Sequence, residues 1–217
     1  VISGEEYAWR LAQTGPSEDG PKTDAFKLPD VGPAIQAARL ARWTTAARQL
    51  ADLPVAKLSK KNQVNYAVYK GQIDALLAEQ QYREYEKPLN ADSSFWGDVA
   101  ESARGSFRTE ADYRGYIAMM RDIPRYYDQQ IANMRAGLAR GFTPAQVTLQ
   151  GRDAGVALVA DAATPEASPF YAPFKTLPAN LPPAVQAALR REAAEAITQA
   201  VVPAHARLRA FLRDDYI

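Results

Sequence analysis

The chain has 217 residues, 47% of them hydrophobic, which is enough to bury a core and predicts one or two domains. Its 26 basic and 25 acidic side chains nearly cancel, so its charge favours neither nucleic acid nor an anionic membrane surface as a partner. Cysteine is absent, which excludes disulfides, thiolate metal sites and a cysteine nucleophile, and no uncharged apolar run approaches the roughly 20 residues of a membrane span.

Apolar residues recur at intervals of three and four through most of the sequence, and strand-like alternation is hard to find. This period predicts an all-α fold, a bundle of about seven helices that forms a single unit over residues 1–217. Residues 14–22, rich in Gly, Pro, Ser and Asp, indicate a surface loop. We expect helices in chain order at residues 4–11, 33–53, 59–86, 95–103, 109–123, 124–141, 143–162 and 183–217.

Caps and prolines set several of these boundaries. Ser59 and Thr109 are good N-caps, and Pro33 suits a first helical turn. Pro124 marks a bend and can begin a further helix, which Gly141 then ends.

The second half of the chain is punctuated by proline. Thr143 and Gln146 form a capping-box pattern that predicts a helix to about residue 162. Residues 164–183 contain six prolines, so no regular element fits, yet aromatic residues such as Phe170 make the segment too apolar for a solvated linker. We expect a packed, extended crossover there, and a kink in the last helix where Pro203 displaces the preceding turn.

Both ends are expected to be cut from a larger helical protein. The first residue is not methionine, and residues 209–217 keep an amphipathic helical pattern without a stop signal. The last helix should therefore show an exposed apolar patch, or a contact that covers it, at Leu208, Phe211, Leu212 and Tyr216. The expected partner is the remainder of the parent chain or a second copy, through this carboxy-terminal helix.

No catalytic or metal-binding residue is assigned from the sequence. His205 is the only histidine, so a His-Glu-x-x-His zinc site cannot be assembled within the chain. We interpret it as a helix-surface or interface residue that follows Pro203. A Gly-x-Ser-x-Gly nucleophile motif and a lysine-bearing phosphate loop do not occur either.

A cleft that binds peptide is the more specific possibility. Tyrosine can bury its ring while offering a hydroxyl, although at helical spacing core packing is the favoured interpretation of the tyrosines. Polar groups set among aromatic residues single out four candidates for a surface that faces a substrate cleft: Arg135, Ser168, Tyr171 and Tyr127.

Ordered motifs carry a family resemblance. The run IPRYYDQQIANMRAGLARG at residues 123–141, followed by TPAQV and SPFYAPFKTLP, resembles the bacterial family catalogued as domain of unknown function 885. LPDV at residues 28–31, FWGDV at 95–99 and AVVPAHARLRAFLRDDY at 200–216 fall in that family's order. The resemblance therefore spans nearly the whole chain.

The resemblance implies a helical, zinc-dependent peptidase whose metal ligands lie beyond the matched region. This chain would be roughly the first third of such a parent, and no family ligand or general base carries over to its residues. No cofactor is expected in this chain, and zinc is expected in the parent. Family members often carry export signals, which favours a periplasmic location.

The leading hypothesis is a non-catalytic helical scaffold that forms one wall of a substrate cleft, with a peptide as the substrate. One alternative is an independent helical module that binds a peptide or a protein helix in a groove. Another is a structural protein from a family member that has lost its metal ligands.

Overall fold

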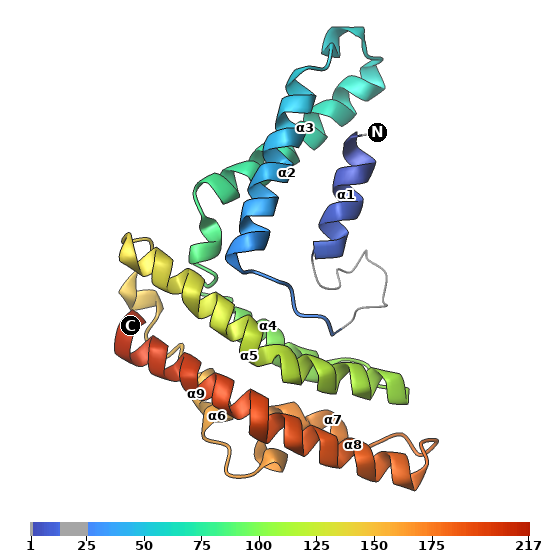
Figure 1. Ribbon diagram of the computed structural model, residues 1–217, viewed down its shortest axis with the longest axis vertical. Helices are drawn as coiled ribbons and strands as arrows, with labels where there is room; N and C mark the ends of the chain where they lie inside the picture. Colours follow the sequence, from blue (N-terminus) through green and yellow to red (C-terminus); the bar gives the residue numbers. More distant parts are fainter. Residues whose placement is uncertain (1, 14–25) are drawn as a thin grey trace. The chain divides into compact units, whose positions relative to one another are not determined.

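The computed structural model describes residues 2–13 and 26–217, and its regular structure there is helical (Figure 1). The fold is all-α, as the apolar period predicts. Contacts group the chain into two compact units: unit 1 comprises residues 1–14 and 30–85, and unit 2 comprises residues 15–29 and 86–217. The single helical unit expected from the sequence stays a prediction, because two such units can belong to one domain. The loop expected at residues 14–22 lies outside the residues that the structure describes.

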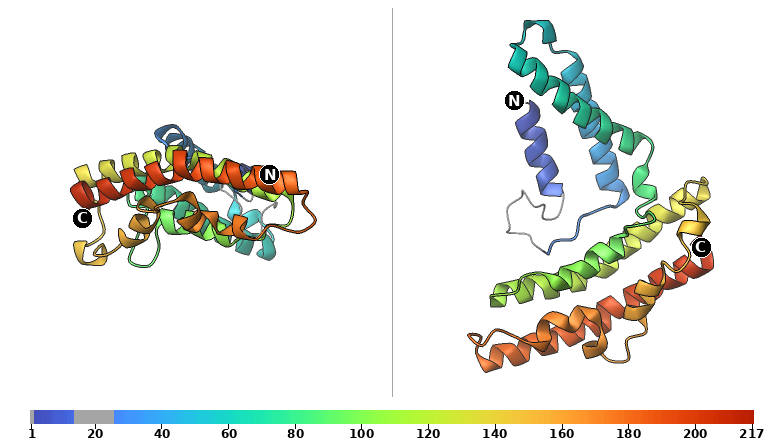
Figure 2. Two further views of the ribbon diagram at one scale, coloured as in Figure 1. Left: turned by 90° about the horizontal axis from the view of Figure 1, so that it is seen from below. Right: turned by 180° about the vertical axis from the view of Figure 1, so that it is seen from behind.

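Unit 1 is built from α1 (Ile2–Gln13), α2 (Pro33–Ala51), the short turn η2 (Val55–Lys57) and α3 (Lys60–Gln81). Helices α2 and α3 lie side by side, and η2 connects them in the sequence (Figures 1 and 2). Both begin as predicted, since Pro33 occupies the first turn of α2 and Ser59 caps α3 by accepting a hydrogen bond from the Asn62 N–H at 3.3 Å. Their buried core consists of Trp43, Ala46, Leu50 and Ile73.

A buried carboxylate connects the helices of unit 1. Glu6 of α1 is 1% exposed, and its Oε1 accepts a hydrogen bond from Trp43 Nε1 on α2 at 3.1 Å. Its Oε2 accepts one from the Tyr69 hydroxyl on α3, also at 3.1 Å, and Arg10 lies 3.2 Å away as the counter-ion. Burial, followed by the charge of Glu6, raises the pKa of Tyr69 to about 12, which keeps this hydroxyl a donor. A charge this deeply buried is tolerated because it is paired and hydrogen-bonded.

Unit 2 has a long helix, α5, that packs against the segment formed by α8, η8 and α9, while α6 packs against α9 (Figure 2). The described helices of unit 2 are α4 (Phe95–Glu101), α5 (Glu110–Ala139), α6 (Ala154–Ala160), α7 (Ala172–Lys175), α8 (Pro183–Ala196) and α9 (Val202–Phe211). Shorter helical turns join them: η4 (Ser102–Arg104), η5 (Gln146–Thr148), η6 (Pro165–Ala167), η7 (Pro169–Tyr171), η8 (Ile197–Val201) and η9 (Leu212–Tyr216). The turn η3 (Glu84–Glu86) precedes them in the sequence.

Helix α5 corrects one expectation. It begins with the predicted Thr109 cap, which forms a complete capping box with Asp112, and it ends before Gly141, whose φ of 72° suits a glycine stop. The division into two helices expected at Pro124 is wrong, because a single helix runs through that position. Proline removes one backbone hydrogen bond, but Ile123 and Tyr127 beside it are fully buried, and this packing keeps the helix continuous.

The helix expected at residues 143–162 is also wrong in its first half. The structure has only the turn η5 and then α6, which begins at residue 154. Gly151 between them has a φ of 76°, a left-handed conformation that ends any helix at that point. The capping box does not form, since the side chain of Gln146 donates to the Ile217 carbonyl at 2.8 Å instead.

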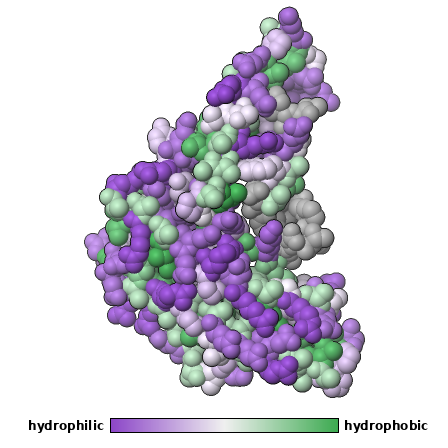
Figure 3. All heavy atoms as spheres, in the orientation of Figure 1, coloured by the Kyte–Doolittle hydropathy of each residue, from purple (hydrophilic) through white to green (hydrophobic). Residues whose placement is uncertain are grey.

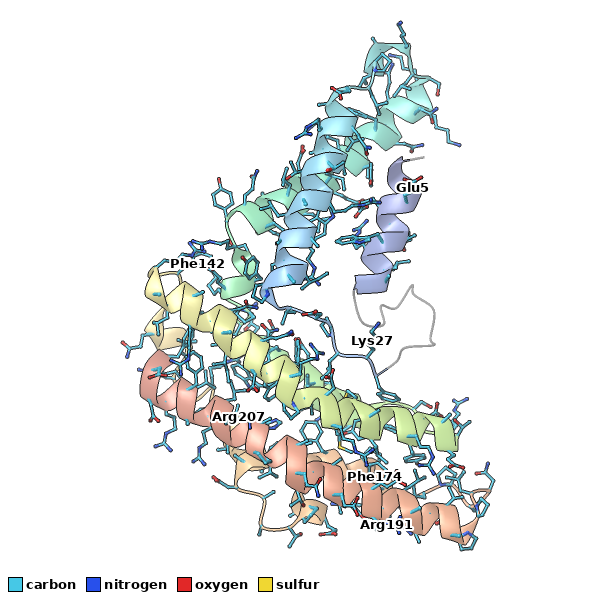
Figure 4. The ribbon with its side chains drawn as sticks, in the orientation of Figure 1. Glu5, Lys27, Phe142, Phe174, Arg191 and Arg207 are labelled. Carbon is cyan, nitrogen blue, oxygen red and sulfur yellow. The ribbon has the colours of Figure 1, made fainter. Side chains whose placement is uncertain are left out.

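The crossover at residues 164–183 is packed, as expected, but it is not extended. It contains η6, η7 and the one-turn helix α7, each with a proline in its first turn, where no N–H is needed. Phe170 and Phe174 are fully buried, and Figure 4 shows Phe174 between α5 and α8. Prolines therefore start short helical turns here.

The last helix departs from α-helical hydrogen bonding just before Pro203, and the kink expected there stays a prediction. The turn before it, η8, is a π-turn, which offers the backbone a different pairing where proline supplies no N–H. The apolar patch expected at the carboxy-terminal end is wrong, because helices of unit 2 bury all the side chains concerned: Leu208, Phe211, Leu212 and Tyr216.

The surface is mixed in polarity. On the face shown in Figure 3, hydrophilic side chains alternate with apolar ones over α8 and α9. Among residues 2–13 and 26–217, no helix combines the length and apolar character that crossing a membrane requires.

Candidate functional site

The histidine of the chain lies inside unit 2, bonded at both ring nitrogens. His205 is 1% exposed, and its Nδ1 lies 2.8 Å from the Val201 carbonyl oxygen. A carbonyl can only accept, so Nδ1 carries the proton and Nε2 accepts a hydrogen bond from the hydroxyl of Tyr127 at 3.1 Å. The imidazole is therefore a neutral connector between α9 and α5.

Burial fixes the protonation of this pair. It lowers the pKa of His205 from 6.5 to about 4, an effect that the hydrogen bond to Val201 only partly offsets. It also raises the pKa of Tyr127 well above 10. Both groups are neutral at physiological pH, and neither reaches solvent.

The expectation that His205 is a surface or interface residue is therefore wrong. The sequence held a signal for its burial: it shares a helical face with Val201, Leu208 and Leu212, at spacings of four, three and four, and all are buried. Pro203 suggests the end of a turn, but this apolar face continues on both sides of the proline.

The described residues do not fit a zinc site. A histidine that binds zinc must offer a free ring nitrogen, and both nitrogens of His205 are bonded within the core. In the part of the chain that the structure describes, His, Asp and Glu side chains do not gather in groups of three or more that could hold a metal.

Two of the four candidate residues meet in the core through the histidine. Ser168 is buried, and its Oγ accepts a hydrogen bond from the Phe170 N–H at 3.3 Å, which caps η7. The Phe170 ring meets the His205 ring edge to face at 5.4 Å, and His205 reaches Tyr127. Ser168 and Tyr127 therefore belong to one buried cluster.

Tyr171, the third candidate, is also buried, with its ring against Phe174 at 5.7 Å. Burial raises the pKa of its hydroxyl. Like Ser168, it lies in the crossover, and its ring contributes to packing.

Arg135 is the candidate that lines an open groove. Its side chain is 56% exposed on α5, and it forms an ion pair of 2.6 Å with Asp215. Its guanidinium also lies over the Phe211 ring, 4.7 Å from the centroid. The groove runs between α5 and the segment α9–η9, and its lining includes Arg207, which pairs with Asp128 at 3.1 Å (Figure 4).

The groove offers exchangeable charged groups. Exposed ion pairs such as these contribute only about 0–1 kcal/mol, so a ligand can replace one partner at little cost. A guanidinium binds a carboxylate or carbonyl through two N–H groups, and the Phe211 face provides apolar surface beside it. This arrangement suits a peptide carbonyl or terminal carboxylate.

Sequence reasoning found Arg135 but missed the rest of the lining. Asp128, Ile131 and Arg135 share one face of α5, and Arg207, Phe211 and Asp214 share one face of the last helix. Each spacing is readable in the sequence, but the pairing of the two faces is not.

The comparison with protein families bears on the whole of this region. A family model described as bacterial protein of unknown function (DUF885) matches residues 15–217. No curated protein matches the chain.

Proposed function

The chain belongs to the bacterial DUF885 family of unknown function, and from this premise we propose that it is a non-catalytic helical scaffold that forms one wall of a substrate cleft in a zinc-dependent peptidase. In this proposal the metal ligands lie outside residues 1–217, and the groove between α5 and α9 faces the substrate peptide.

The groove carries the proposal. It combines Arg135, whose partner Asp215 can be displaced, with the apolar face of Phe211. A peptide presents the matching groups, a carbonyl or carboxylate next to an apolar side chain. The buried histidine supports the proposal that these residues are non-catalytic, because both nitrogens of its ring are hydrogen-bonded within unit 2.

Substitution in the longer protein tests the cleft. Arg135→Ala should lower kcat/KM for peptide hydrolysis about tenfold, the effect of one lost charge-assisted hydrogen bond, with little change in melting temperature. Arg191→Ala is the matched control: Arg191 is an exposed arginine of α8 whose partner Glu195 lies 3.9 Å away.

Tyr171→Phe extends the same test to the crossover. If this segment faces substrate, removing the hydroxyl changes turnover more than melting temperature. The reverse pattern at both positions would reduce Arg135 and Tyr171 to packing residues. Peptide hydrolysis that resists a chelator would contradict the zinc-dependent part of the proposal.

One observation favours a second candidate, an independent helical module that binds a peptide or protein helix. The carboxy-terminal stripe, which the first proposal would leave for another segment to cover, is buried within unit 2. In that case residues 1–217 bind peptides without hydrolysis, and the Arg135→Ala change weakens binding.

A further inference from the structure

Unit 1 contains a groove of its own, bounded by α1, α2 and the end of α3. Its volume of about 310 Å³ lies at the lower end of the range for small-molecule sites. The apolar part of its lining comes from Trp9, Trp43, Leu76 and Tyr85. Four charged residues also line it: Arg10 of α1, Arg39 of α2, Glu79 of α3 and Glu84 of η3. Arg10 pairs with Glu6 and Glu84 has an interaction of its own, so Arg39 and Glu79 decide which ligand the groove suits.

The aromatic wall is held in place before any ligand arrives. The Trp43 indole donates to the buried carboxylate of Glu6 at 3.1 Å, which fixes its ring. Trp9 stands edge-on to Trp43, with centroids 6.2 Å apart and planes at 88°. A wall that needs no ordering on binding loses little affinity to entropy.

Arg39 contributes a cation whose charge is incompletely balanced. Its guanidinium donates to the Asp30 carbonyl oxygen at 3.3 Å, and no carboxylate of the described residues lies within ion-pair distance of it. Burial lowers the pKa of Arg39, and the nearby charge of Asp30 only partly opposes this. An anion in the groove would be attracted to this group.

Glu79 contributes the opposite charge. Within the described part of the chain, its carboxylate has neither a hydrogen bond nor an ion pair. Apart from Arg10 and Glu84, which interact with other residues, the groove thus presents one cation, one anion and an aromatic wall in a small volume. A ligand that satisfies all of them carries a carboxylate, an ammonium group and an apolar side chain.

We propose that this groove binds a small zwitterion with an apolar side chain, namely a free apolar amino acid or a dipeptide. The ligand's carboxylate pairs with Arg39, its ammonium group pairs with Glu79, and its side chain packs against Trp9 and Trp43. This inference does not rest on the function proposed for unit 2.

Calorimetric titration of residues 1–217 with leucine, leucyl-leucine and two blocked forms of the dipeptide tests the proposal. Acetylation removes the ammonium charge and amidation removes the carboxylate charge, so each should weaken binding at least tenfold. Leucine against leucyl-leucine decides between the two ligand sources. This arm uses the unaltered protein. Absence of binding by both zwitterions, or equal affinity for the blocked forms, would overturn the proposal.

Variants assign each charge to its residue. Arg39→Gln should weaken binding of the free dipeptide at least tenfold and abolish the difference between acid and amide. Glu79→Gln should also weaken binding of the free dipeptide at least tenfold, and it should abolish the difference in affinity between the free and the acetylated dipeptide. Arg48→Gln and Glu5→Gln, exposed substitutions on α2 and α1 outside the groove lining, should leave affinity unchanged.

The same variants separate this site from the groove of unit 2. If Arg39→Gln and Glu79→Gln leave the affinity for the dipeptide unchanged while Arg135→Ala lowers it, the dipeptide binds in unit 2 and the assignment to this groove is overturned.

Discussion

Acid should destabilise unit 2 through His205. The folded chain lowers the pKa of this imidazole from 6.5 to about 4, so the unfolded chain binds a proton between these pH values and the folded chain does not. Its contribution to stability is therefore fully present above pH 6.5 and is lost as pH falls towards 4. The whole shift corresponds to about 3 kcal/mol, of which about 2 kcal/mol is lost by roughly pH 5.

The pKa itself is directly measurable. Because the chain has one histidine, the Cε1 proton of its ring gives a single signal to follow in an NMR pH titration. We expect a midpoint near 4. A midpoint near 6.5 in the folded protein would refute the argument, since it would mean that protonation costs nothing in the core.

Urea unfolding supplies the energetic half of this test. His205→Gln keeps a side chain that can donate to the Val201 carbonyl and accept from Tyr127, but it does not titrate. Followed through methyl NMR signals of unit 2, the unaltered protein should lose about 2 kcal/mol more than the variant between about pH 8 and pH 5. Equal losses would show that other groups cause the acid sensitivity.

Two further substitutions test the packing. Glu6→Gln places an N–H donor against the donors that surround the carboxylate, and it should cost unit 1 about 1–3 kcal/mol by thermal unfolding followed through tryptophan fluorescence, whereas the exposed Glu5→Gln should cost almost nothing. Gly137→Ala in α5 would place a Cβ 2.7 Å from a backbone carbonyl oxygen and should lower the stability of unit 2 by about 1–3 kcal/mol. Gly155→Ala in α6 has open space around it and should be neutral or stabilising. Equal effects of the two substitutions on stability would contradict the close approach at Gly137.

Local signals predicted much of the fold. Ser59 and Thr109 cap helices because a hydroxyl satisfies nearby N–H groups wherever the helix packs. Pro33 and Gly141 act through their own φ angles in the same way. These boundaries depend on a few consecutive residues, and the sequence contains all the information that they need.

The predicted helix boundaries were wrong where contacts with residues distant in the sequence determine the local structure. Pro124 stays inside a helix because packing of α5 outweighs a local defect. Gln146 gives its side chain to Ile217, 71 residues away, instead of closing a capping box. A reading of neighbouring residues cannot anticipate either outcome.

The candidate site shows the same contrast between local sequence signals and contacts over long sequence distances. Arg135 was identifiable as a polar group among aromatic residues, but its ion pair with Asp215 joins helices far apart in the sequence. Tyr127 was equally conspicuous and lies in the core, because His205, 78 residues away, provides its partner. Composition pointed to suitable residue types, and tertiary pairing decided which of them line a groove.

The central claim is that residues 1–217 form a scaffold whose metal lies elsewhere, and the zinc content of this chain tests it most directly. The purified chain, exposed to zinc and then dialysed, should retain far less than one zinc per chain, because it has no cysteine and its histidine is bonded at both nitrogens. One tightly held zinc per chain, with release of the Tyr127–His205 hydrogen bond, would contradict the claim.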